Sequence, residues 1–183
     1  VAALVELGRH HEQQHQELLL MDLKHLFSRN PTDPVYVERA ADPVESAGSP
    51  DAGRVPVPDG VAEIGARDER FSYDNERPRH RVYLPGSELA TRQVAVADWR
   101  RFMADDGYAR PELWLSDGWA TVQDEGWEAP GYWRREDDGE WSTFTLSGRR
   151  PLVGAEPVCH VSFYEADAYA RWAGARLPTE FEW

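Results

Sequence analysis

Six prolines between residues 31 and 58 place the strongest constraint on how this 183-residue chain can fold. Proline lacks a backbone N–H donor and fixes its own φ angle, so neither a helix nor a central strand runs through such a stretch. Asp, Ala and Gly fill much of the space between the prolines, a composition typical of a linker. We therefore predict a helical segment at 1–30, a linker at 31–58 and a second domain at 59–183.

The segment before the linker has the pattern of one amphipathic helix over residues 1–29. One set of residues recurs at spacings of three and four, which is the period of a single helix face. Asn30-Pro31 is a stop signal for that helix. The chain begins inside the helix without Met and ends at Trp183 without a stop signal, so we expect a fragment of a longer protein. The face consists of Leu4, Leu7, His11, Gln14, His15, Leu18, Leu19, Asp22 and Leu26.

Beyond the linker, short apolar runs alternate with turn signals, which is typical of short strands. Two amphipathic helices are also predicted. The second has a capping box, with Ser162 at the N-cap and Glu165 three residues later, and Gly174 after its end. Gly107 is predicted to be the C′ residue of the first helix. The predicted strands are 61–64, 80–84 and 88–90, and the predicted helices are 96–106 and 162–173.

Residues 108–157 contain five tryptophans and no clear period. We predict a long loop-rich stretch that is held together by its own aromatic packing. Each tryptophan is expected to belong to the structural core. Within the stretch, the acidic run 136–140 is predicted to be the solvated tip of a hairpin.

The chain carries 20 Lys and Arg against 33 Asp and Glu, a formal net charge of −13. Phosphate backbones and anionic membrane surfaces select for clustered cations, so we expect no nucleic-acid and no membrane partner. A single cysteine, Cys159, leaves no internal disulfide and fits a reducing, cytoplasmic compartment. We expect Cys159 to be a buried structural thiol in a strand at 158–161 rather than a nucleophile.

The chemical signal of the chain is the segment His11-Glu12-Gln13-Gln14-His15. Residues i and i+4 of an α-helix lie about 40° apart around the axis and about 6 Å apart along it. His11 and His15 therefore project from one face, and we predict that they share a metal ion. Gln14 points the same way. His10 points off this face and is expected to be solvated or to support the site from outside.

These residues alone leave the identity of the metal open. The segment satisfies the His-Glu-x-x-His motif of zinc proteases, in which Glu12 would be the general base. Imidazoles also suit iron and copper, and an open position on Fe(II) would permit oxygen chemistry. A third ligand is needed, and His25 lies about 15 Å further along the helix, too far to reach the same ion.

Three stretches of the second domain resemble the formylglycine-generating-enzyme, or sulfatase-modifying-factor, domain. They are the entry segment 71–82, the segment 157–174 and the signature 176–183. The resemblance covers residues 59–183. It implies an α+β fold, in which the C-terminal part of a DinB-like helical bundle precedes an irregular, loop-rich, C-type-lectin-like domain, with the chain truncated at both ends.

A histidine helix in front of such a domain resembles the sulfoxide synthases of ergothioneine biosynthesis, the hercynine oxygenases. Their ligand helix has the pattern that His11, His15 and Glu17 make here. The resemblance implies a non-haem Fe(II) enzyme that uses O₂ to join a thiol, cysteine or γ-glutamylcysteine, to the imidazole C2 of hercynine, giving a sulfoxide.

The same resemblance implies roles for single residues. His11 and His15 would be two of three iron-binding histidines, and Gln14 would contact the substrate imidazole. The third histidine is expected before Val1. The catalytic tyrosine and most of the substrate pocket are expected beyond Trp183, so the fragment alone is expected to be inactive.

Other functions stay open. A related synthase could use histidine itself, as in the ovothiol route, or a selenium donor. A zinc hydrolase could use Glu12, and a domain without catalysis could only bind a ligand. Outside the site, residues 74–76 are predicted to form a capped turn, and Arg176 and Glu180 an ion pair or cap around Leu177-Pro178.

Overall fold

The computed structural model describes residues 1–38, 53–68 and 70–183, which fall into two compact units. Unit 1 comprises Val1–Leu26, Arg54–Leu89 and Pro178–Trp183, and unit 2 comprises Phe27–Gly53 and Ala90–Leu177. Each unit thus joins segments from both halves of the chain. The middle of the predicted linker, residues 39–52, lies outside the described residues, and the division at 30 and 58 stays a prediction.

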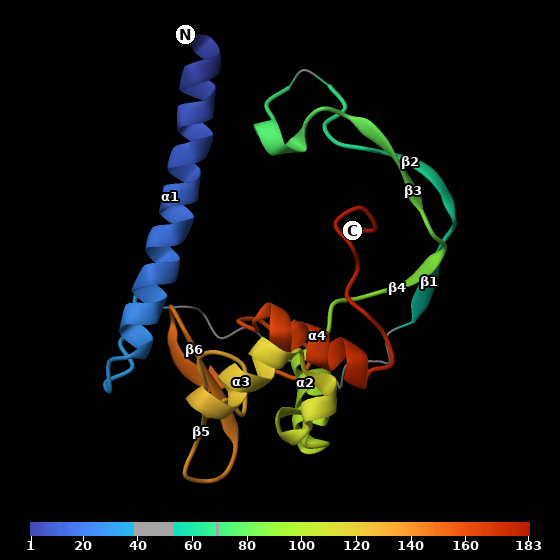
Figure 1. The fold of residues 1–183 in the computed structure, drawn as a ribbon. Helices are drawn as coiled ribbons and strands as arrows, with labels where there is room; N and C mark the ends of the chain where they lie inside the picture. The colour runs from blue at the N-terminus through green and yellow to red at the C-terminus, as the bar shows by residue number, and fades with distance from the viewer. Residues whose placement is uncertain (39–52, 69) are drawn as a thin grey trace. The chain divides into compact units, whose positions relative to one another are not determined.

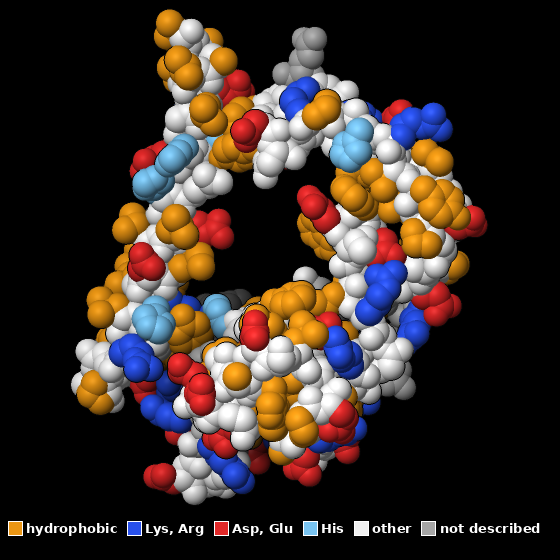
Figure 2. Space-filling model, viewed as in Figure 1, with side chains coloured by type: hydrophobic (Ala, Val, Ile, Leu, Met, Phe, Trp, Pro, Cys, Tyr) orange, Lys and Arg blue, Asp and Glu red, His pale blue; other side chains and the backbone are white. Residues whose placement is uncertain are grey.

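Helix α1 runs from Ala2 to Ser28 without interruption, as predicted (Figure 1). It ends where the Asn30 N–H donates to the Phe27 carbonyl and the Asn30 side chain accepts from Thr32. No residue of α1 is buried. Hydrophobic side chains therefore lie exposed along the helix (Figure 2). Between residues 1 and 22, only His10 is partly buried.

Unit 1 also contains two strand pairs. Strand β2 (Gly60–Ile64) pairs antiparallel with β3 (His80–Leu84), with Gly60 opposite Leu84 and Ile64 opposite His80. Strand β1 (Arg54–Val57) pairs with β4 (Ser87–Ala90). The three predicted strands are confirmed, whereas β1 lies in residues predicted to be linker. A two-stranded ladder has only edges, and an edge strand tolerates a proline such as Pro56.

The segment between β2 and β3 contains a short 3₁₀ helix, η1 (Asp74–Glu76). The Tyr73 N–H donates to the Glu76 carboxylate at 2.7 Å, which caps the turn as predicted. Phe71 and Tyr73, which precede this turn, line a pocket together with residues of α1.

Unit 2 contains the predicted helices α2 (Val96–Ala104) and α4 (Phe163–Trp172). The capping box of α4 is confirmed. The Glu165 N–H donates to the Ser162 hydroxyl at 3.1 Å, and the Ser162 N–H donates to the Glu165 carboxylate at 2.6 Å. Gly174 follows α4 with a φ of +67°, a backbone conformation that favours glycine.

The prediction of little regular structure at 108–157 is wrong. Residues 116–125 form helix α3 (Ser116–Glu125), and a three-stranded antiparallel sheet follows. Gly118 explains part of this, because a Cβ there would lie 2.6 Å from the Tyr164 Cβ, so its absence allows α3 to pack closely on α4. The residual short turns are η2 (Gly107–Ala109) and η3 (Pro111–Leu113), and the strands are β5 (Trp133–Arg135), β6 (Trp141–Thr145) and β7 (Gly148–Pro151).

The acidic run 136–140 connects β5 to β6, which confirms the predicted hairpin. The Glu136 N–H donates to the Glu140 carbonyl at 2.8 Å, closing the turn. The Glu136 carboxylate is not simply solvated, however. It accepts hydrogen bonds from Ser142 and Arg134, and these hydrogen bonds lower its pKa.

The role predicted for Gly107 is also wrong. The left-handed residue after α2 is Asp106, with a φ of +55°, and Gly107 is buried. A Cβ on Gly107 would lie 2.3 Å from Cε2 of Phe102, so glycine is needed here for close packing against an aromatic ring.

The core of unit 2 is aromatic. The rings of Trp99 and Tyr169 stack at 5.0 Å, and Phe102 meets the same cluster edge-on. The Tyr108 hydroxyl donates to the buried Glu165 carboxylate at 2.6 Å, and burial raises the pKa of that phenol. Of the five tryptophans predicted to be structural, Trp114 is buried, Trp119, Trp127 and Trp133 pack against the buried cluster, and Trp141 is half-buried beside Trp133. Trp99 of α2 is also buried, and Trp172 of α4 packs against the cluster.

Candidate metal centre and its surroundings

The structure places His11 and His15 together on an exposed face of α1. Their Nε2 atoms are 2.7 Å apart, and their rings lie at a centroid distance of 4.6 Å with 29° between the planes. This convergence follows from the i, i+4 spacing on an unbroken helix.

This separation fits a shared first-row metal ion. An imidazole nitrogen that binds an ion such as Zn²⁺ lies about 2.0–2.1 Å from it. Two such nitrogens with an N–metal–N angle of about 90° are therefore about 3 Å apart. The observed 2.7 Å is close to that value. His11 and His15 can therefore serve as two neighbouring ligands without a change of helix geometry.

The described part of the chain contains no group of three or more His, Cys, Asp or Glu side chains that could hold a metal ion. The histidine pair is thus a partial centre, and a complete one needs at least one further ligand. Gln14, predicted to contact substrate, lies on the neighbouring turn and is exposed, as are Glu12 and Glu17.

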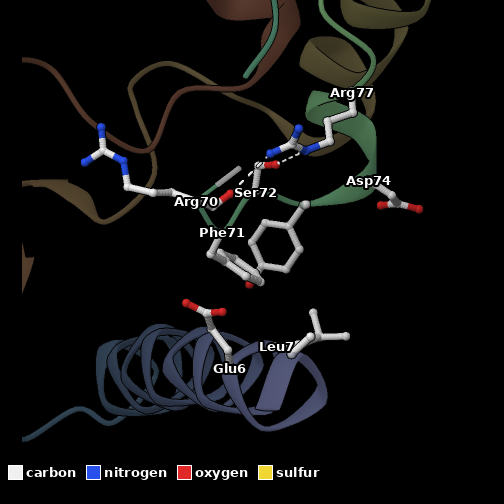
Figure 3. Close-up of a pocket in the computed structure, with 9 residues that line it drawn as sticks. Glu6, Leu7, Arg70, Phe71, Ser72, Asp74 and Arg77 are labelled. Carbon is white, nitrogen blue, oxygen red and sulfur yellow. Dashed lines mark hydrogen bonds between the residues drawn. The ribbon is translucent and has the colours of Figure 1, made fainter. Parts of the chain in front are cut away.

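A pocket of about 670 Å³ lies one to two turns before the histidine pair, in unit 1. Its helix wall consists of Ala3, Glu6 and Leu7, and its other wall is the segment that precedes and includes η1 (Figure 3). Figure 3 shows Glu6 and Leu7 on the side of α1 that faces Phe71. The residues of the second wall are Arg70, Phe71, Ser72, Tyr73, Asp74 and Arg77.

Phe71 and Tyr73 give this pocket its aromatic surface. Their rings meet edge-on at 5.0 Å, and the Tyr73 hydroxyl is buried without a hydrogen-bond partner among the described residues. The imidazole of His10 stacks on Phe71, with 3.9 Å between the ring centroids and 15° between the planes. Of the two roles expected for His10, the solvated one is wrong, because Phe71 covers its ring; the supporting role stays a prediction. In the sequence, the signal that could have predicted this aromatic surface is the pair Phe71 and Tyr73, two aromatic residues with one residue between them.

Cys159 also differs from its prediction. It is exposed, and residues 158–161 do not form a strand. Its thiol lies 3.5 Å from the Pro157 carbonyl. The segment leaves the extended conformation at His160, whose φ is +61°, so the β-branched residues around Cys159 do not continue a ladder.

Near the C-terminus, Arg176 donates to the Leu177 carbonyl, and Glu182 rather than Glu180 caps the following turn by accepting from the Thr179 N–H.

Among the described residues, every helix is too short or too polar to cross a membrane.

His80 does not belong to the histidine pair on α1. Its ring meets that of Phe181 edge-on, with 5.9 Å between the ring centroids.

Comparison with known proteins identifies the family of the larger part of the chain. Residues 39–183 match the family model described as the sulfatase-modifying factor enzyme 1-like domain. The chain belongs to this family. The structure confirms the expected α+β fold, since it contains α-helices and small antiparallel sheets.

Two groups of relatives share this domain. The chain is 41% identical over 183 residues to the hercynine oxygenase of Mycolicibacterium smegmatis, which covers 94% of this chain and 39% of that protein. It is 42% identical over 123 residues to the hercynine oxygenase of Mycobacterium tuberculosis, covering 67% of this chain and 28% of that protein. The formylglycine-generating enzyme of Mus musculus is 31% identical over 147 residues, with 70% of this chain and 38% of that protein covered.

The match to the M. smegmatis protein covers more of this chain than the other two matches do. The 6% left unmatched, about 11 of 183 residues, is shorter than the 27 residues of α1. The similarity to the M. smegmatis protein therefore includes most of the histidine helix as well as the second domain. The chain spans about two fifths of the length of that relative.

Proposed function

We propose that this chain is part of a non-haem iron enzyme of the hercynine oxygenase type. Such an enzyme uses O₂ to join a thiol to the imidazole C2 of hercynine and yields a sulfoxide. One observation carries the proposal: the sequence match to a hercynine oxygenase includes most of a helix on which two imidazole nitrogens converge to 2.7 Å.

In this proposal, His11 and His15 bind Fe(II) through Nε2. Both rings must be neutral for this, since a protonated imidazole has no free lone pair. When bound, the iron supplies the redox chemistry with O₂. We propose that other parts of the full-length protein supply the third protein ligand and the catalytic tyrosine. Among the described residues, no group of three or more His, Cys, Asp or Glu side chains could hold a metal ion.

Gln14 is proposed to contact the substrate. It precedes His15 and lies three residues after His11, so its amide is carried on the same side of α1. A carboxamide can donate to one imidazole nitrogen and accept from another, and it can thereby orient the ring of hercynine without a change of its own charge. Orientation of this kind lowers the entropic part of the barrier.

The test uses the full-length protein, loaded with Fe(II) under anaerobic conditions. We expect O₂ uptake only when hercynine and a thiol are both present, with a sulfoxide product by mass spectrometry. Comparison of cysteine with γ-glutamylcysteine then selects the thiol, and histidine in place of hercynine tests the ovothiol-type alternative.

Two histidine variants of α1 provide the matched control. His11→Ala is expected to lose stoichiometric iron and turnover, whereas His25→Ala, about 15 Å further along the same helix, is expected to keep both. Retained iron in His11→Ala would contradict the ligand assignment. Zinc at one equivalent per chain with no O₂ uptake would instead favour hydrolysis with Glu12 as the base.

A further inference from the structure

Among the described residues, the part of α1 that carries His11 and His15 meets one segment of unit 1, at 70–77. None of its residues is buried, and between residues 1 and 22 only His10 is even partly covered. The residues that meet the segment at 70–77 are Ala3, Glu6, Leu7 and His10, which recur at spacings of three, one and three and so share one face. In the described residues of unit 1, this narrow face is what holds the metal-binding part of the helix.

The strongest contact of that face is a ring stack. His10 lies on Phe71 at 3.9 Å and 15°, a nearly parallel arrangement, and Tyr73 supports Phe71 from the edge at 5.0 Å. Aromatic pairs of this kind prefer offset-stacked or edge-to-face contacts. His10 is also the immediate neighbour of His11, so the stack and the metal-binding pair lie on the same turn.

The platform that carries Phe71 is itself held firmly. The Arg77 guanidinium donates to the Ser72 hydroxyl at 2.6 Å and to the Arg70 carbonyl at 3.2 Å (Figure 3). It also donates to the Asp68 carbonyl at 2.6 Å. One side chain thus connects the backbone before residue 71 to the Ser72 side chain after it. A rigid platform is what a positioning contact requires.

Small rotations of α1 matter for metal binding. Side chains reach about 6 Å from the axis of an α-helix, so a rotation of 10° displaces the tip of His11 or His15 by about 1 Å. Ligand and catalytic groups have to be held within about 0.5 Å. A contact that fixes the direction in which His10 points from the helix axis also fixes the direction of His11, which lies 100° further around that axis.

We infer that Phe71 is a positioning residue for the metal centre, acting through the stacked ring of His10. The inference rests on the proposed function in one respect, namely that His11 and His15 bind iron. It adds a residue from the segment before η1, distant in sequence, to the determinants of that centre. Phe71 would not touch metal or substrate.

The experiment measures Fe(II) affinity, and not only turnover, in the full-length apoprotein by anaerobic competition with a chelator. Phe71→Leu and His10→Ala are each expected to weaken iron binding by between about twofold and tenfold, the range of aromatic-pair energies converted to affinity. The double variant is expected to be no weaker than either single variant, because both remove the same contact.

Conservative variants separate positioning from folding. Phe71→Tyr and His10→Phe keep a ring on each side and are expected to bind iron within about twofold of the unchanged protein. Alanine has a higher helix propensity than histidine, so a loss in His10→Ala does not come from melting of α1. Arg9→Ala, one residue earlier on an exposed position, is the matched control and is expected to have no effect.

Two results would overturn the inference. Iron binding by Phe71→Leu that equals the unchanged protein would do so, as would an equal loss in His10→Phe and His10→Ala. In either case, loss of iron in His11→Ala would show that the proposed ligand pair stands. If His11→Ala keeps its iron, the metal centre itself is elsewhere, and both proposals fall.

Discussion

Helix α1 and the core of unit 2 use their apolar residues in opposite ways. In unit 2, Phe102 is fully buried and Trp99 is 1% exposed, and their rings contact those of Tyr108, Tyr169 and Trp172. In α1, Leu19 is 67% exposed and Leu26 66% exposed. The first region is held by tertiary packing, whereas the second is a regular helix held by its own backbone ladder and one aromatic contact. The difference teaches that the pairing of His11 and His15 depends on spacing within one helix, whereas the aromatic core of unit 2 depends on contacts between segments that are distant in sequence.

The largest effect is expected from a cavity in the aromatic core. Phe102→Ala should lower the free energy of unfolding by about 3–5 kcal/mol, because it removes a fully buried ring and leaves a void that its neighbours cannot fill. Chemical denaturation followed by tryptophan fluorescence measures this. Phe163→Ala is the control, since Phe163 is 63% exposed, and a loss of similar size there would break the contrast between buried and exposed rings.

A smaller effect is expected from the ionic cluster at the start of α2. Asp98 accepts from Arg92 Nη1 at 2.6 Å, from Arg101 Nη2 at 2.6 Å and from the Ala95 N–H at 2.9 Å. Burial acts to raise the pKa of this carboxyl, but these hydrogen bonds lower it further than burial raises it, to about 2. Because the folded-state pKa lies below the unfolded value, the carboxylate stabilises the fold above about pH 4, and this stabilisation disappears as the pH falls toward 2.

The corresponding variant is Asp98→Asn. It should lower the free energy of unfolding at pH 7 by about 2 kcal/mol, which is the value of a shift of nearly two pKa units. It should also flatten the dependence of stability on pH between about 4 and 2. Asp124→Asn, at an exposed position of α3, provides the baseline. An unchanged acid profile in Asp98→Asn would show that the cluster is not what makes this unit sensitive to acid.

The smallest effect is expected on α1. Leu19→Ser in this 183-residue chain should change the free energy of unfolding by less than about 0.5 kcal/mol, as is usual for an exposed position. Thermal unfolding by circular dichroism is sufficient to detect this. A loss of more than about 1 kcal/mol would mean that the apolar face of α1 is covered in solution, and the comparison between the two regions would then need to be withdrawn.

Local patterns in the sequence predicted much of what is local in the structure. The continuous period of 1–29 and the Asn30-Pro31 stop correspond to α1, and the Ser162–Glu165 capping box begins α4 where expected. The i, i+4 spacing of His11 and His15 predicted that their rings lie side by side, because helix geometry places both side chains on one face within reach of each other. Helix α3 was missed because its interior contains Gly118, which weakens the helical pattern and is explained only by the neighbouring Tyr164.

The sequence by itself determined the histidine pair, the capped helices and the membership of the second domain in its family, since each depends on residues close together in the chain. Tertiary structure decided which glycines serve packing rather than turns, that Cys159 is exposed, and that His10 is covered by Phe71. These depend on the ring or backbone that a distant segment brings alongside. Periodicity and spacing carry no information about such partners, because a residue's pattern within its own helix is the same whether or not another segment packs against it.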